Sequence, residues 1–301
     1  MTRSRSVAFV FIAAAGLVGQ VASAQSPTAA SATVAYEAHQ YAACAIAWQA
    51  VAKSGGRTNP ADAFYNAACC YAKDGKAERA LAMLDAASTE GFRDAAAAAK
   101  DADLSLLHGD ARWTKLLALI DERTAAFEKS LVAPALRRQL LAMMDEDQAA
   151  RDAWLAALKD AGVAKARGLA VQAGDRRHSQ ALRAALAEYG WPSRHLVGDD
   201  GAHAAWVLAQ HADLELALQK DALARMKPLV ETHEVAAADY AYLYDRVAVA
   251  EHRPQLYGTQ FDGAEPFPIA DAAHVDERRR AIGLDTLAAY KKVIAETYGN
   301  K

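Results

Sequence analysis

The sequence predicts an all-α protein, and three observations support this fold class. Gly (17) and Pro (8) together make up 25 of 301 residues, about 8% where roughly 12% is usual, which disfavours turn-rich strand architectures. Along most of the chain, apolar residues recur at the three- and four-residue spacing of an amphipathic helix. Hydrophobic residues are 53% of the chain and charged residues 24%, a composition typical of soluble globular proteins.

The first 24 residues are predicted to be a secretory signal peptide. Arg3 and Arg5 give a positive start, Val7–Gly19 is an uncharged, largely apolar run, and Ala22-Ser23-Ala24 is a small-x-small cleavage site. The apolar run is shorter than the roughly 20 residues that span a bilayer. We therefore expect cleavage between Ala24 and Gln25, a mature protein in the periplasm or secreted, and no membrane insertion after signal removal.

Residues 25–35 are rich in Ser, Thr and Ala, and we expect a flexible lead-in there. Residues 36–127 alternate between helical patterns and Gly-containing turns, and one stretch reads Phe64-x2-Ala67-Ala68-x2-Tyr71-x8-Ala80-x3-Leu84-x2-Ala87. The small residues let two antiparallel helices approach closely. This region resembles a short tetratricopeptide-like (TPR-like) array. The resemblance implies helical hairpins that offer a groove to a peptide or protein partner.

The three cysteines are Cys44, Cys69 and Cys70. Export makes disulfides possible, but an odd number of thiols cannot pair completely within one chain. All three lie on helical patterns among Ala and aromatic residues, so we expect small buried hydrophobic side chains. A bridge from Cys44 to Cys69 or Cys70 is the alternative. The absence of a Cys-x-x-Cys pair removes the usual support for thioredoxin chemistry and structural zinc.

Residues 130–301 are predicted to form a second, larger helical domain. Gly190-Trp191-Pro192 favours a helix end, and Asp199 or Asp200 is a candidate N-cap. Three of the eight Pro fall in an irregular stretch, 253–270, where we expect a loop with a short hairpin around 257–261. The predicted helices cover residues 134–161, 163–189, 201–227, 235–251 and 284–298.

Polar side chains interrupt these apolar helices. Gln210-His211 follows an apolar run, and Asp245-Arg246 interrupts a run of aromatic and aliphatic residues. Burying such groups without partners costs several kcal/mol, so we expect them to meet each other, water or a ligand. Asp147 and Arg151 are one helical turn apart and able to pair. Asp276 has the same relation to Arg279 and Arg280.

The second region resembles a bacterial family described only as a domain of unknown function. The residues that carry the resemblance are Asp147-Gln148-x2-Arg151, Gly190-Trp191-Pro192, Gln210-His211-Ala212-Asp213, Asp245-Arg246-Val247, Pro254-Gln255-x-Tyr257-Gly258-Thr259-Gln260 and Val275-Asp276-x-Arg278-Arg279-x3-Gly283-Leu284. The resemblance implies one compact helical domain and transfers no reaction. The candidate ligand-binding or polar-network residues are Asp147, Gln148, Arg151, Trp191, Gln210, Asp245, Arg246, Gln255, Tyr257, Thr259, Gln260, Asp276 and Arg280.

Three hypotheses for function follow. The first is an exported interaction or ligand-binding module, with a protein partner at the array and a small molecule in the second domain. The second is a hydrolase-like enzyme in which His211 is the general base. Asp245 or Asp147 would orient it, and Arg151, Arg246 or Arg280 would bind an anionic group. The third is a polar network that only holds the fold together.

The sequence offers little support for a metal, a cofactor or nucleic acid. His195, His203, His211, His233 and His252 fit no standard pair of metal ligands on one helix. The lone Tyr-Gly-Thr-Gln is not a phosphate loop, because such a loop needs a Gly-rich turn opening a helix and a Lys. The net charge of −3 gives no basic footprint for nucleic acid. We therefore expect no cofactor, no metal and no nucleic-acid partner.

Overall fold

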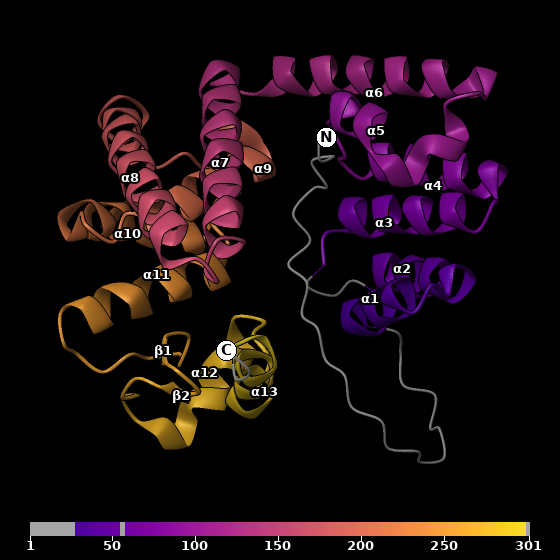
Figure 1. Cartoon of the computed structure of the whole chain (residues 1–301). Helices are drawn as coiled ribbons and strands as arrows, with labels where there is room; N and C mark the ends of the chain where they lie inside the picture. The colour runs from indigo at the N-terminus through magenta and orange to yellow at the C-terminus, as the bar shows by residue number, and fades with distance from the viewer. Residues whose placement is uncertain (1–27, 55–57, 299–301) are drawn as a thin grey trace, which may run out of the picture. The chain divides into compact units, whose positions relative to one another are not determined.

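A computed structural model describes residues 28–54 and 58–298 (Figure 1). The predicted signal peptide therefore lies outside the described residues. The all-α fold is confirmed: the described chain is built of helices, with one two-stranded hairpin. It divides into two compact units after Glu128, and the second covers Lys129–Ile294. None of the helices in the described part is long and apolar enough to cross a membrane.

The first unit consists of successive helices that pack on their neighbours along the chain (Figure 1). Asn59 caps α3 by accepting a hydrogen bond from the Ala61 amide, and Pro60 is its first residue. Ala68 and Ala80 are fully buried where α3 meets α4. The helices are α1 Ala29–Glu37, α2 Tyr41–Lys53, α3 Pro60–Lys73, α4 Ala77–Thr89, α5 Ala95–Lys100, the 3₁₀ turn η1 Ala102–Leu107, and α6 Ala111–Ser130.

The expected flexible lead-in is wrong from Ala29 onward, because α1 begins there. Thr28 and Ser31 cap each other: the Thr28 hydroxyl accepts from the Ser31 amide, and the Ser31 hydroxyl accepts from the Thr28 amide. This reciprocal cap satisfies donors that a short helix would otherwise leave open. Ala32 is fully buried in the core of the unit. A composition rich in Ser, Thr and Ala is thus compatible with a capped, docked helix.

The preference for three unpaired cysteines is also wrong. Cys44 of α2 and Cys70 of α3 form a disulfide, with their Cα atoms 5.9 Å apart, and Cys69 is free and buried. The two bridged residues are buried between packed helices, which brings their sulfur atoms together. Consecutive helical residues point about 100° apart, and no local pattern indicates which of the two adjacent cysteines, Cys69 or Cys70, faces α2.

The second unit is a bundle in which α7 packs on both α8 and α9. Its core contains Leu140, Leu182, Leu208 and Met226, all nearly or fully buried. Gly190 ends α8 at φ +76°, a conformation that L side chains rarely adopt. The elements are α7 Pro134–Leu155, α8 Ala161–Tyr189, α9 Arg194–Gln210, α10 Leu216–Val230, α11 Ala237–Ala250, β1 Phe261–Asp262, β2 Glu265–Pro266, η2 Ala272–His274, α12 Val275–Ala281 and α13 Leu287–Tyr298.

The helix predicted over 201–227 is in fact two, α9 and α10. The side-chain Nε2 of Gln219 donates to the backbone carbonyls of Ala209 and Gln210 at 3.2 and 3.3 Å. These bonds give partners to carbonyls at the C-terminus of α9 and hold the turn between α9 and α10. Gly198 breaks α9 with a non-helical φ of +76° and ψ of 172°, so a second helical segment starts there, next to the predicted caps Asp199 and Asp200. The Asp200 carboxylate accepts from the Gly201 amide at 2.8 Å and pairs with the buried Arg137 of α7 at 2.5 Å.

The irregular stretch contains a hairpin a few residues after its expected place. It lies at 261–266, with Phe261 opposite Pro266, rather than around 257–261. The short helix α12, which follows it, was not predicted. Its charged sequence, Val275–Ala281, has too few apolar residues for a helical period to stand out.

Candidate functional site

Three helices bring four polar side chains together in the second unit. Asp147 and Arg151 come from α7, Asp175 from α8, and His211 is the residue that ends α9. We call these four residues the His211 cluster. The Asp147 side chain is 2% exposed and that of His211 26% exposed, so a buried carboxylate lies behind a ring that reaches solvent.

The hydrogen bonds within the His211 cluster converge on Asp147. His211 Nδ1 lies 2.7 Å from Asp147 Oδ2, and Arg151 Nε lies 3.2 Å from each carboxylate oxygen. Gln148 Nε2 donates to Oδ2 at 3.0 Å. Arg151 Nη2 donates to Asp175 Oδ1 at 2.7 Å. Arg151 thus bridges two carboxylates, one of which holds the imidazole.

Two groups compete for His211 Nδ1. A carboxylate only accepts, so the shorter contact, 2.7 Å to Asp147 Oδ2, favours a proton on Nδ1. Arg151 Nε lies 3.0 Å from the same Nδ1, but a guanidinium has no acceptor and a protonated Nδ1 has none to offer. Arg151 therefore donates to Asp147. In the neutral ring the lone pair is on Nε2, the nitrogen that faces away from Asp147.

The two carboxylates of the cluster have opposite pKa shifts. Burial would raise the pKa of Asp147, but the hydrogen bonds and positive charge of His211 and Arg151 outweigh it and hold that pKa below its ordinary value. Burial raises the pKa of Asp175, opposed by Arg151 and reinforced by the negative charge of Asp147. Asp147 is therefore the firmly ionised member of the cluster.

Gln210 and Arg246 form a second group, next in sequence to His211. Arg246 Nε donates to Gln210 Oε1 at 2.7 Å, and Nη1 donates to Asp213 Oδ1 at 2.6 Å. Gln210 is 5% exposed, and its buried Nε2 has no hydrogen-bond partner among the described residues. This group joins the end of α9 to α11.

Asp245, a candidate for orienting His211, holds the 253–270 loop instead. Its carboxylate is fully buried and accepts from the amides of Leu256, Tyr257 and Thr259 and from the Thr259 hydroxyl, at 2.8–3.2 Å. Burial raises the pKa of Asp245, and the three amide bonds oppose that rise. Gly258 lies within this cradle at φ +66°, where an added Cβ would come 2.9 Å from Ile269 and Leu287.

Gln255 and Gln260 also close the loop on itself. The side-chain nitrogen of Gln255, Nε2, donates to the backbone carbonyls of Gln260 and Phe267 at 2.9 Å. Its side-chain oxygen, Oε1, accepts from the backbone amide of Gln260 at 2.9 Å. Gln255 is fully buried. The side chains of Gln255 and Thr259 therefore form hydrogen bonds within the domain, and these bonds hold a loop that has little regular strand pairing. The Tyr257 ring meets that of Tyr244 edge-on.

Of the three consecutive arginines 278–280, the neighbours of the candidate Arg280 are the ones whose side chains bond to the loop backbone. Arg280 is exposed, whereas Arg279 is 1% exposed and donates to the Tyr257 and Asp285 carbonyls at 2.6 and 2.5 Å. Arg278 donates to the Leu256 carbonyl at 2.9 Å. Asp276 accepts from the Leu287 amide at 2.6 Å.

The predicted site residues thus separate into sets. Asp147, Gln148, Arg151 and His211 meet, and Gln210 and Arg246 pair beside them. Trp191 is 4% exposed in the apolar core and belongs to neither polar group. The loop set comprises Asp245, Gln255, Tyr257, Thr259, Gln260 and Asp276. Asp175 was missed, because no local pattern reveals that an acid 24 residues from Arg151 will face it.

One group of three potential metal ligands lies together among the described residues, in the first unit. It comprises Cys69, Asp101 and Asp103, with ligand atoms within 4.8 Å of one another. The Tyr65 hydroxyl donates to Asp101 at 2.7 Å and that of Tyr36 to Asp103 at 2.5 Å. Burial raises the pKa of the Cys69 thiol, so the thiolate that a metal needs is disfavoured.

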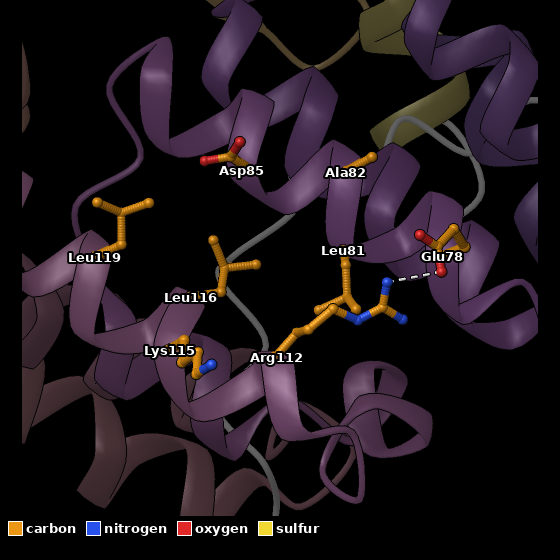
Figure 2. A pocket seen from close by; sticks show the side chains of 8 residues that line it. All are labelled: Glu78, Leu81, Ala82, Asp85, Arg112, Lys115, Leu116 and Leu119. Atoms are coloured by element: carbon orange, nitrogen blue, oxygen red, sulfur yellow. Dashed lines mark hydrogen bonds and ion pairs between the residues drawn. The ribbon is translucent and has the colours of Figure 1, made fainter.

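The first unit also has a groove of about 350 Å³ between α4 and α6. Figure 2 shows Leu81 of α4 with Leu116 and Leu119 of α6 along it, and the Arg112–Glu78 ion pair beside Leu81. The α4 wall carries Glu78 and Asp85, and the α6 wall carries Arg112 and Lys115. Each wall uses the same i, i+3, i+4, i+7 positions of its helix.

Comparison with known proteins identifies the second unit. A family model described as a family of unknown function (DUF6624) matches residues 134–301, more than half of the chain. The resemblance to a family without known activity is thereby confirmed, while the TPR-like resemblance stays a prediction. No curated protein and no solved structure matches the chain.

Proposed function

Because the chain belongs to the family of unknown function DUF6624, we propose a function from its own side chains. It is an exported helical protein that binds a small molecule at the His211 cluster and moves a proton there. Export rests on the leader sequence of residues 1–24. The sequence favoured a binding module over an enzyme; the geometry of His211 favours a site that does both.

One observation carries the proposal: the buried Asp147 lies 2.7 Å from His211 Nδ1, and the ring is 26% exposed. A carboxylate in this position selects the tautomer with a basic Nε2 and stabilises the imidazolium formed when Nε2 takes a proton. Histidine is suited to this work because its unperturbed pKa is near neutral. His211 is therefore the general base, and Asp147 orients it.

The charges around His211 favour a neutral or cationic ligand. Arg151 is bonded to Asp147 and Asp175, two carboxylates against one guanidinium. Arg246 is paired with Asp213 at 2.6 Å. Neither arginine is free to bind an anionic group, which argues against the anion-binding role considered from the sequence.

The network hypothesis accounts best for the 253–270 loop. Asp245, Gln255 and Thr259 direct their polar atoms to loop backbone or to each other. Their bonds fix the loop and leave no group for a ligand. The proposal of a ligand site is therefore confined to the His211 cluster and its neighbours Gln210 and Arg246.

A melting-temperature screen tests the binding step. The protein lacking residues 1–24 is screened against neutral and cationic envelope metabolites and cell-wall fragments. A ligand that raises the melting temperature should lose that effect in His211→Ala, which stays folded. His195→Ala is the matched control, because that exposed histidine lies outside the cluster. Equal shifts in both variants would exclude binding at His211.

The proton-transfer step needs its own test. Hydrolysis of ester, amide and glycoside panels is measured for the wild type, His211→Asn and Asp147→Asn. We expect rate losses of about 10²–10⁴-fold in both variants, the usual size for removal of an acid–base group. A ligand whose binding depends on His211, but which is not turned over by any of the three proteins, would leave a binding protein without catalysis.

For the first unit, we propose a docking role in the α4–α6 groove. The apolar positions Leu81, Leu116 and Leu119 suit the narrow apolar stripe of a partner's amphipathic helix. One wall is acidic and the other basic, but Glu78 is paired with Arg112 and Asp85 with Arg123. A partner helix that is basic on the flank facing α4 and acidic on the flank facing α6 would exchange these pairs for its own. A designed helix with these flanks should bind at least tenfold better than one with the flanks exchanged; equal binding would exclude this partner.

A further inference from the structure

The end of the α7–α8 hairpin exposes large apolar side chains. Leu155 is 47% exposed, Leu158 45%, Val163 45% and Leu169 57%. Leu155 ends α7, Leu158 lies in the connection, and Val163 lies in the first turn of α8. Single exposed apolar residues are ordinary, but four of them within residues 155–169 are a candidate interaction surface.

The same segment is basic in an acidic protein. Between Leu155 and Leu169 lie Lys159, Lys165 and Arg167 and a single acid, Asp160, whereas the whole chain has a net charge of −3. Asp160 is the N-cap of α8: its carboxylate accepts from the amides of Gly162 and Val163 at 3.0 and 3.1 Å. Of the residues that the structure describes, none forms an ion pair with the three cations.

We propose that this hairpin end, residues 155–169, docks on an anionic lipid surface. Leu155, Leu158 and Val163 enter the boundary between headgroups and acyl chains, to the shallow depth usual for interfacial segments. Lys159, Lys165 and Arg167 meet the anionic headgroups.

The charge distribution also sets the direction of approach. The acidic remainder of the protein is repelled by an anionic surface, so the basic end is presented first. The proposed contact is interfacial and needs no membrane-spanning helix. The inference is independent of the chemistry proposed for His211.

Vesicle co-sedimentation tests the proposal with the protein lacking residues 1–24. Vesicles of phosphatidylcholine alone are compared with vesicles in which about a third of the lipid is phosphatidylglycerol. We expect binding to the anionic vesicles that weakens as salt rises, because headgroup attraction is screened. Lys165→Glu should weaken binding about 30-fold, as expected for two charge units at the surface. Leu158→Gln should weaken it at least tenfold.

Matched variants elsewhere on the chain serve as controls. Leu214→Gln removes another exposed leucine, 59% exposed, and Lys227→Glu makes the same charge change at an exposed lysine outside the hairpin; both should stay within twofold of the wild type. Absence of binding to anionic vesicles would overturn the proposal. Equal losses in the control variants would also overturn it. So would a dimer that Leu158→Gln dissociates, because the hairpin end would then bind a second copy of the chain.

Discussion

Two buried aspartates of the same domain are used in different ways. Asp245 is fully buried and accepts from three backbone amides and a hydroxyl of the loop that follows α11. Asp147 is almost as buried, but its partners are the side chains of His211, Arg151 and Gln148. A carboxylate bonded to backbone fixes a chain path, whereas one bonded to an imidazole fixes a reactive group. Burial alone does not distinguish the two roles; the identity of the donors does.

The largest effect should come from Asp245→Ala. The change leaves four buried or half-buried donors without an acceptor, and we expect the free energy of unfolding to fall by about 3–5 kcal/mol. Urea unfolding followed by circular dichroism measures this loss. A loss below about 1 kcal/mol would mean that Asp245 does not hold the loop.

A second test compares two neighbouring arginines. Arg279→Lys removes the forked bonds to the Tyr257 and Asp285 carbonyls and should cost about 2–3 kcal/mol of unfolding free energy. Arg280→Lys changes an exposed side chain and should stay within about 0.5 kcal/mol of the wild type. Equal losses in the two variants would contradict the assignment of Arg279 to the loop.

Asp147→Asn should have a smaller effect on stability and a larger one on chemistry. The amide keeps the shape and one acceptor, so we expect a loss of about 1–2 kcal/mol in unfolding free energy. The tautomer of His211 is no longer selected, which should show in the ring nitrogen shifts measured by NMR. An unchanged tautomer in this variant would separate Asp147 from the proposed base.

The smallest effect is on the pH dependence of stability. The pKa of Asp147 is lowered in the folded state, so its ionised form stabilises the fold above the unfolded pKa of about 3.9, and this contribution is lost as the pH falls through the folded value. Asp245, with a raised pKa, has the opposite sign and opposes folding as the pH rises through its folded value. Unfolding free energies of the wild type and Asp147→Asn should therefore converge below pH 4; a constant difference would contradict the shift.

The helices could be predicted from sequence to a large extent, because apolar spacing survives in most of them. The prediction failed where hydrogen bonds of side chains determine where a helix begins or ends. The Gln219 amide ends α9 and separates it from α10, and the Thr28–Ser31 cap starts α1 in a stretch that composition assigns to a loop. Such hydrogen bonds depend on individual side chains, so the spacing of apolar residues does not reveal them.

The site was predictable only within one helix. The four-residue spacing of Asp147 and Arg151 predicts the pair that the structure contains. The approach of His211, 64 positions from Asp147, depends on how α7 and α9 pack. Asp175 was missed for the same reason. Arg279 lies one position from the arginine chosen, and on a helix one position turns the side chain by about 100°.

Two adjacent residues of α11 bond to different parts of the domain, and this suggests a way to detect changes near His211 at a distance. Asp245 is bonded to the loop, and Arg246 to Gln210, the residue beside His211. A turn of α11 about its axis would displace both side chains together. A molecule that turned α11 while drawing Arg246 from Gln210 would therefore also loosen the bonds from the amides of Leu256, Tyr257 and Thr259 to Asp245. Hydrogen exchange at those three positions becomes a remote readout of events at the imidazole.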